Sequence, residues 1–376
     1  MKSATVQERF TALDIFRGMT ICFMIIVNTS GNSTTTYWPL LHADWHGFTP
    51  TDLVFPSFLF AVGNALSFVS KKWDAMRQQD VLWKIAKRTL LIFGIGYLMY
   101  WFPFFRLDND LHIVAAPLYN TRIMGVLQRI ALCYGIVALM VYYLGNNKTM
   151  VLGIIGLFIY WALLAHFGVQ GAEYTKTGNA VLRLDTWLFG VNHLYGGEGF
   201  PFDPEGVLST IPALFNVIGG YAVGNFLQKK RKSYEALTKI MLAGVLLLFA
   251  AYCWNDFFPI NKKLWTSSYS LLTVGLDCVI LSAIIYLTDF IGLKKGTNFF
   301  IVAGKNPLAI YLLSELGVTV MFMIHIGNQS LFRWLYLNLF SLGGDYFGAL
   351  LFAVWWMFSC WFVGYLLDKK KIYIRL

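Results

Sequence analysis

The sequence has little charge. Only 13% of its 376 residues are Asp, Glu, Lys or Arg, whereas 57% are hydrophobic and 17% are aromatic. A soluble domain carries about 25% charged residues, so this composition excludes an ordinary cytosolic enzyme and a disordered chain. The length would allow two or three soluble domains. The composition instead indicates one membrane domain that covers residues 1–376.

Cysteine pairs and the common nucleotide-binding motifs are also missing. The five cysteines lie far apart without a CxxC pair, and most fall within apolar runs, where cysteine acts as a small hydrophobic residue. We therefore expect neither a disulfide nor a zinc site. The sequence lacks a GxSxG elbow, a Walker loop and a GxGxxG turn, which sets aside serine hydrolases, P-loop enzymes and dinucleotide-binding enzymes.

Apolar runs long enough to cross a bilayer recur along the chain. A membrane-spanning helix needs about 20 such residues, and ten runs meet this requirement. The predicted spans are residues 12–30, 51–70, 84–105, 122–144, 149–168, 206–228, 236–257, 266–289, 298–325 and 346–367. The predicted fold is therefore all-α, a polytopic membrane protein of about ten transmembrane helices. Because Arg17 interrupts the first run and no small-residue cleavage site follows, we expect no signal peptide.

Lysine and arginine are unevenly distributed between alternate loops. Twenty of them fall on one side of the predicted membrane and six on the other. Cytoplasmic loops carry the excess of Lys and Arg, so both termini are predicted to be cytoplasmic. The net charge of +10 then reflects topology, and no nucleic-acid partner is expected. The loops on the other side, residues 31–50, 106–121 and 169–205, are long and rich in aromatic residues, which is typical of functional loops.

Four cations remain after those counted toward the two sides of the membrane: Arg17, Arg122, Arg129 and Lys305. A charge at the centre of a span costs at least about 2.5–3.5 kcal/mol on insertion scales, so these residues are candidate site residues. Arg17 shares a helix face with Asp14, and a structural ion pair is its alternative role. Arg122 and Arg129 lie two turns apart and would form either a track for an elongated anion or two separate ion pairs. Lys305 precedes a proline that interrupts the helix, which is typical of a segment that lines a cavity.

Two histidines flank a tryptophan in the first long outer loop. His42 and His46 enclose Trp45 and Asp44. A zinc site needs three or four ligands, and two histidines with one carboxylate do not supply them, so no metal is predicted. The pKa of histidine, about 6.5, suits proton transfer at neutral pH. A general base is therefore the preferred interpretation of this cluster, with His193 as a further candidate in another outer loop.

Several short segments resemble the transmembrane acyltransferase family of heparan-α-glucosaminide N-acetyltransferase. They are LDIFRG at 13–18, VN at 27–28, HADWHG at 42–47, DLVFP at 52–56, RIMGVLQR at 122–129, DPEG at 203–206, NKKLW at 261–265 and GKNP at 304–307. The segments are ordered along the chain from residue 13 to about residue 311, so the resemblance covers most of the sequence.

The resemblance implies a specific reaction. It implies transfer of an acetyl group from cytosolic acetyl-CoA to the amine of a glucosamine-type sugar on the far side of the membrane, with no metal. The essential histidine of the family corresponds to His42, and the asparagine at the end of its first span corresponds to Asn28. His42 would act as general base or as acetyl carrier, and Asn28 would donate a hydrogen bond to the oxyanion. The expected location is a bacterial inner membrane, and the resemblance is compatible with a homodimer.

Further site residues follow from this expectation. The phosphates of coenzyme A require cations within the bundle, and the expected cofactor contacts are Arg17, Arg129, Lys305, Arg122 and Gln128. The three outer loops would form the acceptor side. The expected acceptor contacts are Asp203, Glu205, Trp45, Asp52 and His193.

Two other classes of protein stay open at this point. A secondary transporter or flippase for an amino sugar or glycolipid would use the same buried charges as a coupling site and would require an ion gradient. An assembly protein would use them as bundle ion pairs, but packing alone does not require the cluster at residues 42–46. The identity of the acceptor sugar and the choice between N- and O-transfer also stay open.

Overall fold

The computed structural model describes residues 10–107, 112–230 and 233–374. Its long helices are α1 (Thr11–Asn28), α2 (Val54–Ser70), α3 (Gln78–Trp101), α4 (Val126–Phe167), α6 (Thr210–Lys230), α7 (Tyr234–Asn255), α8 (Ser267–Ile285), α10 (Pro307–Met323) and α12 (Asp345–Lys369). Shorter helices are α5 (Ala180–Phe189), α9 (Thr297–Lys305) and α11 (Leu331–Leu335). Two small hairpins pair β1 (Phe105–Leu107) with β2 (Ile113–Ala115), and β3 (His325–Ile326) with β4 (Gln329–Ser330).

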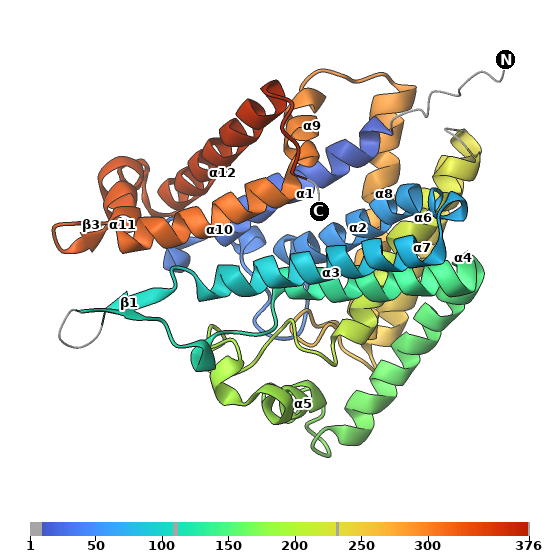
Figure 1. Cartoon of the computed structure of the whole chain (residues 1–376), viewed down its shortest axis with the longest axis horizontal. Helices are drawn as coiled ribbons and strands as arrows, with labels where there is room; N and C mark the ends of the chain where they lie inside the picture. The colour runs from blue at the N-terminus through green and yellow to red at the C-terminus, as the bar shows by residue number, and fades with distance from the viewer. Residues whose placement is uncertain (1–9, 108–111, 231–232, 375–376) are drawn as a thin grey trace.

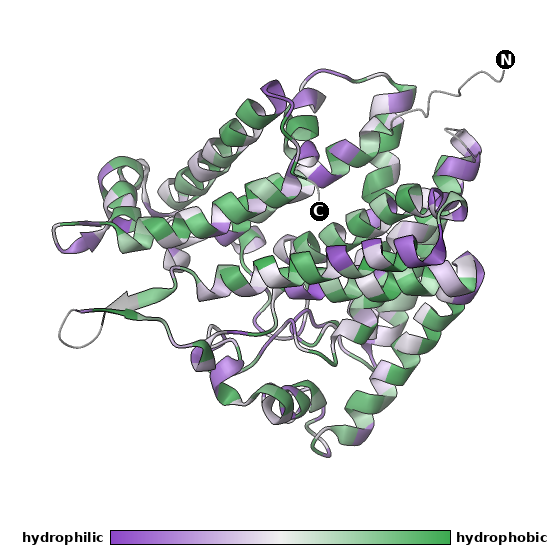
Figure 2. Cartoon of the chain, viewed as in Figure 1, coloured by the Kyte–Doolittle hydropathy of each residue, from purple (hydrophilic) through white to green (hydrophobic). Residues whose placement is uncertain are grey.

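The helical bundle confirms the predicted all-α membrane fold. Among the described residues, seven helices are long and apolar enough to cross a bilayer, and α9 with α10 would add an eighth as one bent span. Figure 1 shows the long helices side by side, and Figure 2 shows apolar residues along them and hydrophilic residues at their ends and in the loops. The count of ten spans and the cytoplasmic position of both termini stay predictions.

Two predicted spans share the range of α4, and a third is broken. The predicted spans 122–144 and 149–168 correspond to two helical segments of α4 that meet at a kink at Gly145, whose φ of +71° and ψ of 177° are not helical. The predicted span 298–325 separates into α9 and α10, whose axes differ by 82°. The break lies at Asn306, whose φ of −127° and ψ of 49° are not helical, and Pro307 begins the next helix because its missing N–H is not needed there.

Glycines allow helices of the bundle to cross at short distance. A Cβ atom at Gly63 of α2 would lie 1.9 Å from the carbonyl oxygen of Val217 in α6. At the crossing of α1 and α9, a Cβ atom at Gly304 would lie 2.1 Å from the carbonyl oxygen of Asp14. Small residues stabilise membrane helices by letting the backbones approach. These contacts fix α1 and α2 against the rest of the bundle.

The outer loops fold onto one another around an aromatic cluster. Trp45, Phe202, Phe258 and Leu264 come from three separate loops and are all buried. The indole nitrogen of Trp45 donates a hydrogen bond to the carbonyl oxygen of Tyr174 at 2.7 Å. These contacts bring the first outer loop, the loop before α6 and the loop between α7 and α8 to one end of the bundle.

Candidate active site

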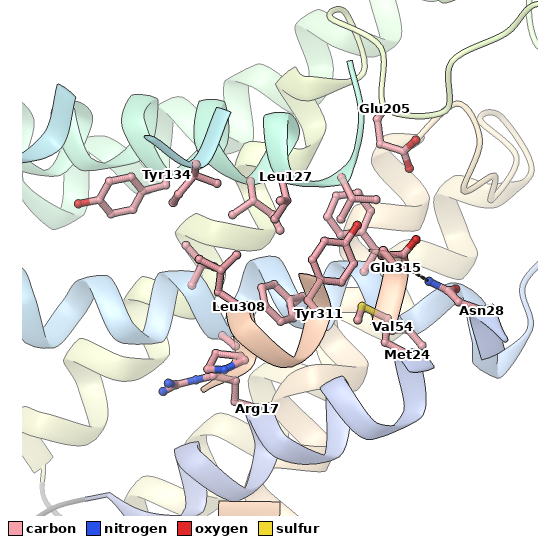
Figure 3. Close-up of a pocket in the computed structure, with 18 of the residues that line it drawn as sticks. Arg17, Met24, Asn28, Val54, Leu127, Tyr134, Glu205, Leu308, Tyr311 and Glu315 are labelled. Atoms are coloured by element: carbon pink, nitrogen blue, oxygen red, sulfur yellow. Dashed lines mark hydrogen bonds between the residues drawn. The ribbon is translucent and has the colours of Figure 1, made fainter. Parts of the chain in front are cut away.

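A cavity of about 1570 Å³ lies among α1, α2, α3, α4 and α10. One end is cationic and is lined by Arg17, Lys84, Lys87, Arg88 and Lys305, together with Asp14. The middle is apolar, lined by residues that include Met24, Val54, Ile92, Leu127 and Leu308. The other end is lined by polar residues that include Asn28, His42, Glu205, Lys262 and Glu315. Figure 3 shows Arg17 and Tyr134 at one end and Glu205, Glu315 and Asn28 at the other, with Leu127 and Leu308 between them.

His42 and Asp52 form a hydrogen-bonded pair at the polar end. The imidazole Nδ1 lies 2.7 Å from Oδ1 of Asp52. The other carboxylate oxygen accepts hydrogen bonds from the backbone N–H groups of Thr49 at 2.9 Å and Ala43 at 3.2 Å. Thr49 is the N-cap of the helical turn Pro50–Leu53. Because an ionised carboxylate only accepts hydrogen bonds, we assign the imidazole proton to Nδ1. Nε2 is then left with a lone pair.

A lysine from the loop between α7 and α8 reaches the same histidine. The ammonium nitrogen of Lys262 lies 3.0 Å from Nε2 of His42 and 4.0 Å from Oδ1 of Asp52. Burial lowers the pKa of His42 from its usual 6.5, and the charge of Lys262 lowers it further, against the opposing effect of the bond to Asp52. Burial also lowers the pKa of Lys262. The imidazole of His42 is therefore neutral at neutral pH.

Arg122 organises the acidic segment that follows α5. It forms a bidentate ion pair with Asp203 at 2.7 and 2.9 Å and also contacts Glu205 at 2.5 Å. Its guanidinium lies between the rings of Tyr100 and Tyr195, at 4.9 and 4.5 Å from their centroids. Burial raises the pKa of Glu205, but the charges of Arg122, Arg129 and Lys262 together outweigh burial and lower that pKa. Glu205 therefore presents a charged carboxylate to the cavity.

Asn28 and Glu315 meet at the same end of the cavity. The amide nitrogen of Asn28, at the last residue of α1, donates a hydrogen bond to Oε1 of Glu315 at 3.3 Å. Figure 3 marks this bond and shows Tyr311 beside it. One amide hydrogen of Asn28 is engaged by this bond, which leaves the second available to a ligand.

The cationic end holds two of the arginine and lysine residues predicted from the spans. Arg17 donates a hydrogen bond to the carbonyl oxygen of Gly304 at 3.1 Å and lies 3.6 Å from Asp14. Lys305 contacts both oxygens of Asp368, at 2.8 Å each. Both side chains line the cavity.

Other predicted contacts lie outside the cavity lining. Arg129 is fully buried and donates hydrogen bonds to the carbonyl oxygen of Gly206 and to Ser209, with its guanidinium 4.9 Å from the centre of the Trp265 ring. It thus contacts the acidic segment and does not line the cavity, and its contact with the cofactor stays a prediction.

The remaining predicted contacts lie behind the cavity wall. Gln128 is fully buried beside Gly96, and Asp203 is buried against Arg122. Trp45 packs in the aromatic cluster, and His193 donates a hydrogen bond to the carbonyl oxygen of Thr121 at 2.7 Å. These four side chains support the site from outside the lining.

Sequence reasoning missed several residues that line this cavity. Lys262 lies in the NKKLW segment, but it was counted only as a loop cation because its approach to His42 depends on how the loops fold. For Glu315 the sequence allows either a pairing with Lys305 or a place in another site, and it does not indicate the contact with Asn28. Lys84 and Lys87 were assigned to a cytoplasmic loop. Their spacing of three residues, with Arg88 next in sequence, places cations on one helix face, and that pattern was the available signal.

Sequence comparisons agree with the geometry of the site. Residues 9–252 match the family described as heparan-alpha-glucosaminide N-acetyltransferase, catalytic. The chain is 27% identical to the Mus musculus heparan-alpha-glucosaminide N-acetyltransferase over 431 aligned residues, which cover 98% of this chain and 61% of the relative. It is 27% identical to the Homo sapiens protein over 370 residues, 82% of this chain and 53% of the relative. The chain thus spans less than two thirds of the length of these relatives.

Proposed function

The chain belongs to the family of the heparan-α-glucosaminide N-acetyltransferase catalytic domain, and from this premise we propose that it is an acetyl-CoA-dependent acetyltransferase. It transfers an acetyl group from cytosolic acetyl-CoA to the amine of a glucosamine-type sugar on the opposite side of the membrane. The protein needs no metal for this reaction. It is a multi-pass protein of the bacterial inner membrane, and its outer loops face the periplasm.

One observation carries this proposal. A single cavity joins a cationic end, which we predict to be cytoplasmic, to an end that holds a histidine–carboxylate pair. The phosphates of coenzyme A fit the cations, and its pantetheine arm fits the apolar middle. Arg17 and Asn28 lie eleven residues apart on α1, about 16 Å along the helix axis. An extended arm can therefore carry the thioester to the polar end while the nucleotide stays at the other.

The chemistry at the polar end follows from the placement of three groups. Nε2 of His42 accepts a proton as the sugar nitrogen attacks the thioester carbon, and Asp52 stabilises the resulting imidazolium. Asn28 and Lys262 donate hydrogen bonds to the oxyanion that forms on the carbonyl oxygen. When the C–S bond breaks, the proton on the imidazole passes to the departing thiolate. Attack by Nε2 itself, with an acetyl-histidine intermediate, uses the same groups.

The acceptor is recognised by charge. An amino sugar carries an ammonium group before it reacts, and the carboxylates of Glu205 and Glu315 both line the polar end. The carboxylate of Glu205 can hold the ammonium beside His42. The ammonium then releases one proton to solvent, and the neutral amine that results is the nucleophile. Tyr195, at the same end, supplies an aromatic face for the sugar ring. An amino sugar is therefore preferred to a neutral sugar.

Acetyl transfer by purified protein tests this function. Labelled acetyl-CoA and glucosamine are mixed with wild type, His42→Ala or His46→Ala. His46 is the matched control because it lies in the same loop, where its Nδ1 lies 3.4 Å from the amide nitrogen of Asn261 and its ring packs against Trp45. We expect His42→Ala to lose activity by about 10²–10⁴-fold, the usual contribution of a general base, and His46→Ala to retain it. Equal activity of all three proteins would refute the role of His42, and a wild type that binds no acetyl-CoA would favour the transporter alternative.

A further inference from the structure

The chain after α12 returns to the cationic end of the cavity. Lys371 adopts a left-handed conformation with φ of +55°, and the N–H of Ile372 then bonds to the carbonyl oxygen of Leu367 at 2.9 Å. This turn directs the last described residues away from the helix. Tyr373 and Ile374 line the same cavity as Arg17 and Lys84.

Two side chains at the break between α9 and α10 fasten this segment. The amide nitrogen of Asn306 donates to the carbonyl oxygen of Ile372, and its amide oxygen accepts from the N–H of Ile374, both at 3.0 Å. The side-chain amide of this fully buried asparagine therefore pairs with the backbone of the segment, with one donated and one accepted hydrogen bond, as the backbone of a neighbouring strand would. The hydroxyl of Tyr373 donates to Asp368 at 2.7 Å, and Asp368 also accepts from Lys305.

The fastened segment presents apolar surface where phosphate-binding cations meet the cavity. Ile374 is 48% exposed and Tyr373 is half-buried. Cations alone bind any polyphosphate, because charge attraction has no shape preference. An aromatic ring next to them adds a surface on which a nucleobase can stack. The turn at Lys371 ends the helix, and the two hydrogen bonds of Asn306 place the segment against the cavity.

We propose that residues 372–374 form one wall of the acetyl-CoA site and recognise its nucleotide end, with Asn306 as the positioning residue. The proposal rests on the proposed function, since it names the part of the site that separates coenzyme A thioesters from short thioesters. Tyr373 packs against the adenosine while Arg17, Lys84 and Lys87 hold the phosphates. The reacting groups at the opposite end of the cavity are unaffected by this wall.

The experiment compares two acetyl donors. Acetyl-CoA carries the nucleotide, whereas S-acetylpantetheine has the same thioester and arm without it. For Tyr373→Ala and for a chain that stops after Lys371, we expect the KM for acetyl-CoA to rise roughly ten-fold, as for loss of one stacked base. The kcat and the KM for S-acetylpantetheine should stay at the wild-type values. Tyr373→Phe keeps the ring and loses only the hydroxyl that donates to Asp368, so its KM for acetyl-CoA should rise less than that of Tyr373→Ala.

Three results would overturn the proposal. An equal loss with both donors would show that the segment only stabilises the fold. An unchanged KM for acetyl-CoA in both altered chains would show that it does not contact the nucleotide. A wild type that uses S-acetylpantetheine as well as acetyl-CoA would show that no nucleotide recognition exists, while leaving the acetyltransferase function intact. Asn306→Ala is a second test. It releases residues 372–374 without removing them, and it should also raise the KM for acetyl-CoA.

Discussion

Asp52→Asn should inactivate the enzyme while leaving its fold intact. In the wild type, Oδ2 of Asp52 accepts two backbone N–H groups, from Thr49 at 2.9 Å and Ala43 at 3.2 Å. An asparagine must keep its oxygen at this position, because an NH₂ group there would face two donors. Its NH₂ group therefore lies where Oδ1 was, 2.7 Å from Nδ1 of His42. The imidazole can accept that hydrogen bond only with its own proton moved to Nε2.

The displaced proton determines the size of the effect. Nε2 loses the lone pair that accepts the proton of the sugar amine, and a wrong tautomer of this kind removes most of the contribution of a histidine base, about 10²–10⁴-fold in kcat. Thermal stability should change little, because the hydrogen bonds to the backbone persist. Asp44→Asn is the matched control, since Asp44 is an exposed carboxylate of the same loop.

The assay is steady-state acetyl transfer at pH 7, with a thermal melt of each variant. The reasoning predicts a large fall of kcat for Asp52→Asn, a normal melting temperature, and an active Asp44→Asn. It would be refuted if Asp52→Asn kept a kcat near that of the wild type. An inactive variant with a strongly lowered melting temperature would also contradict it, because Asp52 would then act through stability.

Three further predictions follow from the charges and packing. Because burial and the charge of Lys262 lower the pKa of His42, the acidic limb of the pH profile of kcat/KM should lie below pH 6.5. The limb should move to higher pH in Lys262→Met, and an unmoved limb would contradict the effect of Lys262 on the pKa of His42. Lys84→Ala should raise the KM for acetyl-CoA and reduce its dependence on salt, because one phosphate contact is lost; an unchanged salt dependence would exclude that contact. Gly63→Ala should destabilise the protein by about 1–3 kcal/mol through overpacking, whereas Gly94→Ala should not, because a Cβ atom at Gly94 would meet nothing within 4 Å. Equal melting temperatures of the two variants would exclude the close crossing of α2 and α6.

The sequence predicts the helices well because bilayer-length apolar runs leave few other structures. The break near Lys305 was predictable from the proline that follows it, and the two apolar runs in α4 correspond to the two helical segments on either side of the non-helical Gly145. The number of helices that cross the membrane was harder to predict from the sequence. It depends on how α9 and α10 are placed, and local hydropathy does not determine that placement.

The site was predictable only in part, because its groups come from distant segments. His42 and Asn28 were found through motifs, and both line the cavity. Lys262 approaches His42 from 220 residues away, and no local pattern encodes that contact. Arg129 illustrates the opposite case. A buried cation in a span indicated a ligand site, but Arg129 lies outside the cavity lining, and one of its guanidinium nitrogens donates to the carbonyl oxygen of Gly206, 77 residues away.

Transfer between the two sides of a sealed membrane tests the central claim most directly. Purified protein is reconstituted into proteoliposomes that enclose glucosamine, and labelled acetyl-CoA is added outside only. The account predicts labelled N-acetylglucosamine inside the vesicles with wild type and none with His42→Ala. Label that reaches the sugar only when both substrates are on the same side would contradict transfer through this cavity.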